Sequence, residues 1–174
     1  MKNGVRIREL RPSDSFANFS LGPEDRGLEN FFKQDSKEYQ ERSLAYTYVF
    51  VEGEEVLGAI SLVCSEIYDG DSYVRDAIEL EGVNFPRKSF PAVKIARLAV
   101  NKEHQKKGIG TQLVDFSIEC SRRIAEIAGC RFIVLDANEE AIGFYVRQYK
   151  FELASLSRDP NNDTSPLFLD LNKR

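Results

Sequence analysis

The alternation of apolar and polar residues predicts three strands in the first part of the chain. Apolar residues alternate with arginines from Val5 to Leu10, as in a strand with one buried face. Tyr46–Val51 is rich in aromatic and β-branched residues and predicts a second strand. Val56–Ile67 predicts a third strand that forms a hairpin with the second. Because Gly58 interrupts it, we expect a bulge or the close approach of another segment there.

Between the first two of these strands the apolar spacing becomes helical. Leu28, Phe31 and Phe32 lie at steps of three to four residues, in a segment that runs from Glu24 or Gly27 to about Glu41. We expect Phe31 and Phe32 to be core residues.

A longer amphipathic helix is predicted from about Thr111 to Ala128, after an apolar strand at Val93–Val100. Gly129 follows it, at the position where a helix C-terminus favours a left-handed residue. The expected apolar stripe of this helix consists of Ile109, Leu113, Phe116, Cys120, Ile124 and Ile127.

The rest of the chain predicts a strand, a helix and a last strand. Arg131–Ala137 is apolar enough for an interior strand. Asn138 is a good N-cap for the helix that follows it. Leu167–Leu171 alternates and predicts the final strand. The long irregular segment Tyr68–Pro91 is expected to border a substrate site, because connections of this length are uncommon unless they are functional.

Composition limits the class of protein. A chain of 174 residues with 42% hydrophobic residues fits one globular domain, residues 1–174. No apolar run reaches the roughly 18 residues needed to span a bilayer, so no membrane partner is expected. The N-terminus has no apolar region of the kind found in signal peptides, and we expect a cytoplasmic protein.

Cysteine, histidine and charge exclude further classes. Cys64, Cys120 and Cys130 show no paired spacing, and His104 is the single histidine, so we expect no metal site and assign the cysteines to the core. The net charge is −4, and Tyr46–Val100 alone holds nine acidic and five basic residues. There is no general basic field for nucleic acid. The acidic region would suit a cationic amine, although such charge runs are often only solvated.

The connection between the Val93–Val100 strand and the long helix carries the strongest chemical signal. It holds Gln105, Lys106, Lys107, Gly108, Ile109 and Gly110. The first amides of a helix point out of its N-terminus and favour an anion, and glycine lets a ligand approach the backbone. The patterns of the Walker loop and of dinucleotide-binding loops are both absent. The sequence therefore predicts another kind of phosphate-bearing ligand.

These residues match the pattern Gln/Arg-x-x-Gly-x-Gly/Ala, and Arg97-Leu98-Ala99-Val100 stands directly before them. In this the chain resembles the GNAT superfamily of acyl-CoA N-acyltransferases, in which the loop holds the pyrophosphate of coenzyme A. The resemblance continues through Gly143-Phe144-Tyr145 to Phe151, with Lys150 where the family often has glycine. The segment before the Arg97–Val100 motif is similar to a branch that includes tRNA-acetylating toxins.

The resemblance implies an α+β fold in three layers (α/β/α). It consists of a mixed, mostly antiparallel sheet of six to seven strands, with a V-shaped splay between strands four and five and helices on both faces. It also implies acetyl-CoA as cosubstrate. The implied cofactor-binding residues are Leu98, Ala99, Val100, Gln105, Lys106, Lys107, Gly108, Ile109, Gly110, Thr111, Asn138 and Tyr145.

The implied reaction is direct attack of a neutral amine on the thioester. A backbone amide near Leu98 would stabilise the oxyanion, the edge Leu98–Val100 would pair with pantetheine, and Tyr145 would donate a proton to the leaving thiolate. Glu66 is a weak candidate for the general base, and water could serve instead.

The acceptor is left open. A small amine or a peptide amino group is the leading expectation. Aminoacyl-tRNA is the alternative, which the acidic balance disfavours, and a CoA-binding module without activity is a third reading. A homodimer is among the possible assemblies.

Overall fold

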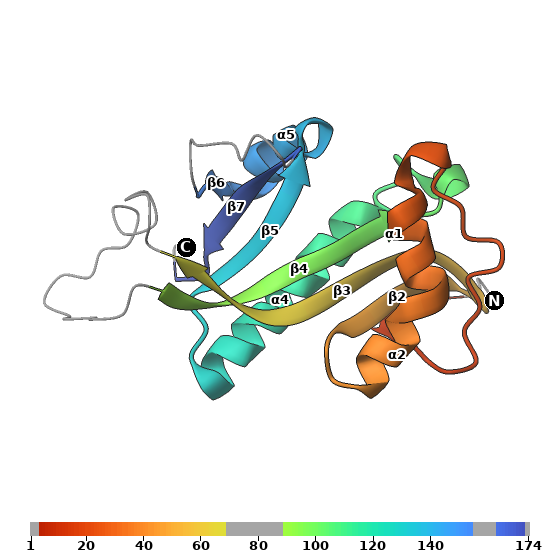
Figure 1. Ribbon diagram of the computed structural model, residues 1–174, viewed down its shortest axis with the longest axis horizontal. Helices are drawn as coiled ribbons and strands as arrows, with labels where there is room; N and C mark the ends of the chain where they lie inside the picture. The colour runs from red at the N-terminus through yellow and green to blue at the C-terminus, as the bar shows by residue number, and fades with distance from the viewer. Residues whose placement is uncertain (1–3, 69–88, 155–162, 173–174) are drawn as a thin grey trace, which may run out of the picture. The chain divides into compact units, whose positions relative to one another are not determined.

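The structure is a computed structural model that describes residues 4–68, 89–154 and 163–172. The described strands are β1 (Val5–Glu9), β2 (Tyr46–Glu52), β3 (Glu55–Tyr68), β4 (Ser89–Val100), β5 (Phe132–Asn138), β6 (Glu152–Leu153) and β7 (Thr164–Asp170). The described helices are α1 (Arg26–Asn30), α2 (Ser36–Glu41), α4 (Ile109–Ala128) and α5 (Glu139–Tyr149) (Figure 1). A π-helical turn at Phe31–Asp35 joins α1 to α2, and 3-10 turns occupy Pro23–Asp25 and Lys102–His104.

The strands form one sheet in the order β1-β2-β3-β4-β5-β7-β6. The pairs β1–β2, β2–β3, β5–β7 and β6–β7 are antiparallel, whereas β4 and β5 are parallel. The expected mixed, mostly antiparallel sheet of an α+β fold is therefore confirmed. The splay between strands four and five stays a prediction.

The chain divides into two compact units, which we describe separately. The first unit comprises Met1–Val63 and Ile95–Glu119, and the second comprises Cys64–Lys94 and Cys120–Arg174. Strands β3 and β4 and helix α4 each contribute to both. The assignment of one domain to residues 1–174 stays a prediction.

In the first unit, helices cover both faces of the sheet. Val49 and Val51 of β2 pack into a cluster with the buried side chains of Phe31 and Phe32, as predicted, on the face that α1 and α2 cross in Figure 1. On the other face, the ring of Tyr48 lies 4.7 Å from the ring of Phe116 in α4. Successive side chains of β2 thus pack against helices on opposite faces of the sheet, because side chains in a strand alternate between its two faces.

Gly58 explains how α4 packs so closely on β3. A Cβ atom there would lie 2.8 Å from Ile109 Cγ2 and 3.0 Å from Leu113 Cδ1. The β2–β3 register also shifts between Phe50 and Val51, opposite this point. Both expected features of a glycine inside a strand, a bulge and a close approach, are confirmed.

The second unit contains an aromatic core and helix α5. The ring of Phe132 in β5 lies 5.8 Å from Phe90 and 5.6 Å from Phe168. Helix α5 contacts β5 and β7, and Figure 1 shows β5 and β7 side by side. Asn138 caps α5 as predicted, because its Oδ1 accepts a hydrogen bond from the Ala141 amide at 2.9 Å.

Some details of the sequence interpretation are wrong. Ile127 is 86% exposed, because it lies in the last turn of α4, where residues 126–129 are all exposed. Cys64 is exposed rather than in the core, since it lies at an outward position near the end of β3. β4 begins at Ser89 and includes Pro91, whose carbonyl accepts the Arg131 amide at 3.0 Å. A proline carbonyl keeps this capacity although its nitrogen has no proton.

The expected acceptor-side segment Tyr68–Pro91 falls mostly on residues 69–88, outside the described residues. In the part of the chain that the structure describes, no helix combines the length and the apolar character needed to cross a membrane.

Candidate functional site: the loop between β4 and α4

Asn101 fixes the start of the loop that follows β4. Its side chain is 4% exposed, its amide donates to Leu57 O at 2.8 Å, and its Nδ2 donates to Asn18 O at 3.1 Å. Its carbonyl accepts the His104 amide at 2.8 Å, which closes the 3-10 turn. The side chain and the backbone of Asn101 therefore tie the start of the loop to two distant segments, at Asn18 and Leu57. Sequence reasoning missed Asn101, whose only signal was a polar residue directly after an apolar strand.

The next residues turn the chain twice through left-handed backbone conformations. Lys106 has a φ of 60° and Gly108 a φ of 82°. A Cβ atom on Gly108 would meet nothing within 4 Å, so glycine is favoured there for its backbone angle and not for room. Consecutive amides in such alternating conformations form concavities that bind anions. The Gln105 side chain supports the loop by donating to Val100 O at 3.2 Å.

Helix α4 then starts with its N-terminus at this loop. Its first hydrogen bond runs from the Gln112 amide to Gly108 O at 3.1 Å, so the amides of Ile109 and Gly110 come before it. Ile109 is buried, which anchors the first turn of the helix, whereas Lys106 and Lys107 are exposed. Exposed lysines, left-handed turns and the N-terminus of a long helix together fit the diphosphate of coenzyme A.

The end of β4 supplies the segment expected to bind pantetheine. Ala99 is buried, and Leu98 and Val100 are half-buried. On the same strand, the guanidinium of Arg97 lies 5.4 Å from the centre of the Phe31 ring, a cation–π arrangement. The role of the Leu98 amide as oxyanion donor stays a prediction.

Tyr145 belongs to the second unit and lies in an apolar environment. It is 6% exposed, and its ring lies 5.0 Å from that of Phe144 and 5.6 Å from that of Phe151. Burial raises the pKa of Tyr145 to about 12. The phenol is therefore protonated at neutral pH, as a proton donor must be. Its predicted approach to the thioester stays a prediction.

Glu66 is a poor fit to the role of general base. Its exposed carboxylate accepts hydrogen bonds from the hydroxyl of Tyr68 and, at 2.8 Å, from that of Ser89. These two hydrogen bonds, that of Tyr68 foremost, hold the pKa of Glu66 below its usual value. A carboxylate stabilised in its charged form is a weaker proton acceptor.

The described residues contain no candidate metal centre. In residues 4–68, 89–154 and 163–172, no three His, Cys, Asp or Glu side chains gather as metal ligands would. His104 is half-buried in the 3-10 turn before the loop.

The fold and the loop define the class of protein, an enzyme that transfers an acyl group from coenzyme A to nitrogen. The model of the acetyltransferase (GNAT) family matches residues 6–151. The chain belongs to this family, and acetyl-CoA is its cosubstrate.

Several solved structures share this fold. A bacterial toxin has a TM-score of 0.81 at 19% identity, over 97% of this chain and 92% of that one. A tyrosine-to-phenylalanine variant of KacT has a TM-score of 0.79 at 24% identity, over 96% and 95%. AtaT complexed with acetyl-methionyl-tRNAfMet has a TM-score of 0.77 at 22% identity, over 96% and 95%. A search of curated proteins found no match.

Proposed function

We propose that the enzyme acetylates a primary amine by direct attack of the amine on acetyl-CoA. The observation that carries the proposal is the loop from Gln105 to Thr111, with its two left-handed residues and the helix start behind it. This loop would hold the diphosphate, and the backbone of Leu98–Val100 would align the pantetheine arm. The amide of Leu98 would stabilise the oxyanion, for which one preorganised donor contributes roughly 3 kcal/mol.

In this proposal Tyr145 protonates the departing thiolate. Support comes from its place in the Gly143-Phe144-Tyr145 match to the family. Burial raises the pKa of Tyr145 to about 12, so the phenol holds its proton at neutral pH and is a weaker acid than a free phenol. The amine acceptor must be neutral to attack, and either Glu66 or water would take its proton. Asn138 would contact coenzyme A in addition to capping α5.

The α-amino group of aminoacyl-tRNA is a second candidate acceptor. The observation that favours it is the similarity in fold to AtaT, which was solved in complex with acetyl-methionyl-tRNAfMet. The net charge of −4 argues in the other direction, because binding to nucleic acid depends strongly on Lys and Arg. A small amine or a peptide amino group is the first candidate.

The test is release of free thiol from acetyl-CoA, measured with small amines, peptides and charged tRNA as acceptors. Tyr145→Phe should lower kcat by about 100-fold or more, the range typical of a lost general acid, with affinity for coenzyme A unchanged in calorimetry. Tyr149→Phe is the matched control, because it removes a phenol from the same helix.

Coenzyme A binding without thiol release, for every acceptor and in the wild type, would refute the catalytic proposal. Equal loss of rate in the two tyrosine variants would refute only the role of Tyr145.

A further inference from the structure

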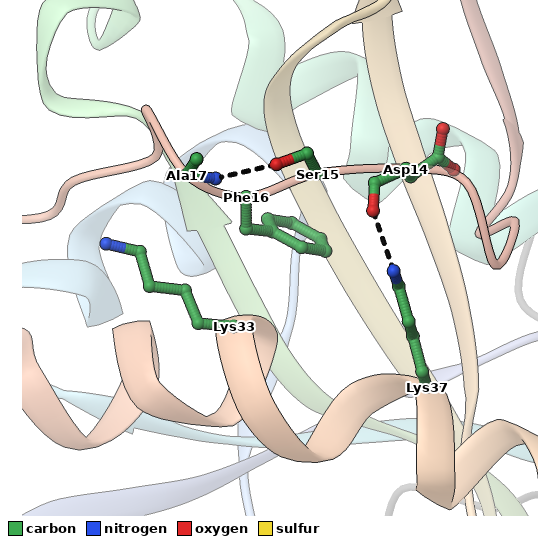
Figure 2. A pocket seen from close by; sticks show the side chains of 6 residues that line it. All are labelled: Asp14, Ser15, Phe16, Ala17, Lys33 and Lys37. Atoms are coloured by element: carbon green, nitrogen blue, oxygen red, sulfur yellow. Dashed lines mark hydrogen bonds between the residues drawn. The ribbon is translucent and has the colours of Figure 1, made fainter.

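The first unit contains a hollow between the Asp14–Ala17 segment and the helical run that follows Phe31 (Figure 2). Its volume is about 290 Å³. The lining residues are Asp14, Ser15, Phe16, Ala17, Lys33 and Lys37. This volume lies just below the range for small-molecule sites, roughly 300–1,000 Å³. It suits a single polar group better than a whole cofactor.

Lys37 brings an uncompensated positive charge to this hollow. Its Nζ donates to the carbonyls of Pro12 and Asp14, both at 2.7 Å, and the second contact is visible in Figure 2. Among the residues that the structure describes, it forms no ion pair with a carboxylate. Because an ammonium has three N–H donors, one remains for a ligand.

Lys33 and Ser15 add further donors. The Lys33 ammonium pairs with Glu29 Oε1 at 2.6 Å, which leaves two of its three N–H groups. The hydroxyl oxygen of Ser15 accepts the Ala17 amide at 3.2 Å, so its proton is available to an acceptor. The hollow thus offers donors from both of its sides.

The lining carboxylate does not cancel these charges, because another cation already neutralises it. Arg8 donates to both oxygens of Asp14, at 2.6 and 2.7 Å, and the Arg11 amide adds a third bond at 2.7 Å. Asp14 is 6% exposed and presents little charge to a ligand. The ammonium of Lys37, which has no carboxylate partner among the described residues, therefore determines the sign of the potential in the hollow. Lys33, whose charge is paired with Glu29, contributes N–H donors.

A neighbouring hollow has the opposite character. It has a volume of about 310 Å³, shares Ser15 and Ala17 with the first, and is lined by Glu54 and Glu55. The sign of the charge changes across the shared segment. An anion is therefore directed to the lysine side, and a cation to the glutamate side.

We propose that the hollow with Lys33 and Lys37 binds a phosphate group of the amine acceptor. The tetrahedral phosphate presents oxygens to donors on several sides, and lysine binds it as a point charge. This inference rests on the proposed function and narrows the substrate to amines that carry phosphate, either a small amine phosphate or an RNA.

The test compares acceptors with and without phosphate in steady-state kinetics. The variants are Lys33→Gln, Lys37→Gln and the double substitution. Arg42→Gln is the matched control, since Arg42 pairs with Glu38 at 2.9 Å, has a side chain 68% exposed and does not line the hollow. The acceptors are O-phosphoethanolamine, aminoacyl-tRNA and a phosphate-free amine.

For a phosphate-bearing acceptor, the double substitution should raise KM about tenfold, equivalent to about 1.4 kcal/mol. The KM for acetyl-CoA, kcat and the phosphate-free reaction should not change. Lys33→Gln alone should give a partial effect, which keeps the test valid if loss of Lys37 loosens the Asp14 segment. If KM rises only for aminoacyl-tRNA, the bound phosphate belongs to RNA. If KM rises for O-phosphoethanolamine, the bound phosphate belongs to a small amine.

An unchanged KM, or an equal change with the phosphate-free amine or in Arg42→Gln, would overturn the inference. A ³¹P NMR titration with inorganic phosphate separates the two proposals. If no amine is acetylated but phosphate binding depends on the lysines, the proposed function fails and the phosphate site stands. If amines are acetylated and neither KM nor phosphate binding depends on the lysines, only the phosphate site fails.

Discussion

Substitution of Gly58 by alanine should destabilise the first unit and disturb the coenzyme A loop together. The added methyl group would lie 2.8 Å from Ile109 Cγ2, 3.0 Å from Leu113 Cδ1 and 3.3 Å from the carbonyl of Ala99. Distances below about 3.4 Å between such atoms are repulsive, since optimal carbon contacts lie near 3.5–4.0 Å. The carbonyl belongs to the paired backbone of β4, so the helix must move.

The expected cost is that of overpacking a core, about 1–3 kcal/mol. For a chain of this size, each 1 kcal/mol lowers Tm by roughly 2–4 °C. Because Ile109 begins α4, the displacement also moves the amides that we propose to bind the diphosphate. We therefore expect Gly58→Ala to lower Tm by about 2–12 °C and to raise the KM for acetyl-CoA, with little change in kcat.

The assay is urea unfolding in parallel with steady-state kinetics. Gly27→Ala is the control, because a Cβ atom there meets nothing within 4 Å and α1 tolerates alanine. It should stabilise the protein by about 0.4–1 kcal/mol and leave the KM for acetyl-CoA unchanged. If Gly58→Ala is as stable as the wild type and binds acetyl-CoA equally well, the argument that β3 determines the position of α4 is wrong.

Three further predictions concern the loop, an ion pair and a helix cap. Gly108→Ala and Gly53→Ala both place alanine at a positive φ, of 82° and 62°, and each should cost about 1 kcal/mol of stability; only Gly108→Ala should weaken coenzyme A binding in calorimetry. Burial alone would raise the pKa of Asp14, but its hydrogen bonds to Arg8 and to the backbone outweigh burial and lower it. The Asp14 carboxylate therefore contributes its full stabilisation above the unfolded pKa of about 4. This stabilisation is lost as the pH falls through the lower pKa of the folded state. The difference in unfolding free energy between wild type and Asp14→Asn should therefore disappear in unfolding curves measured at acid pH. Asn138→Ala should cost about 1 kcal/mol in urea unfolding, and no cost would mean that the hydrogen bond to the Ala141 amide is dispensable.

Much of the local structure could be predicted because it depends on neighbouring residues. Gly129 has the expected left-handed φ of 70° after α4. Lys150, at the end of α5, also adopts a left-handed φ, of 62°, where the related family often has glycine. A lysine adopts this backbone conformation less easily than glycine does. The backbone conformation at the end of α5 is thus retained without the residue that adopts it most easily.

Errors arose where the burial or pairing of a segment depends on contacts with residues distant in the sequence. The helical spacing of Ile127 is correct, yet residues 126–129 of that turn are all exposed, and Ile127 itself is 86% exposed. The strand β6 has two residues, Glu152 and Leu153, too few to show an alternation. Such a segment becomes a strand only because β7 offers free hydrogen-bonding groups beside it.

The sequence alone determined the identity of most strands and helices, the caps at Asn138 and Gly129, and the loop that assigns the chain to its family. These features follow from interactions over a few residues. Only the tertiary structure decided that Asn101 joins the loop to Asn18 and Leu57, and that Lys33 and Lys37 line one hollow with Ser15. The reason is physical: which distant segments meet depends on how side chains fill a shared core, and that packing is not encoded in any single stretch of the chain.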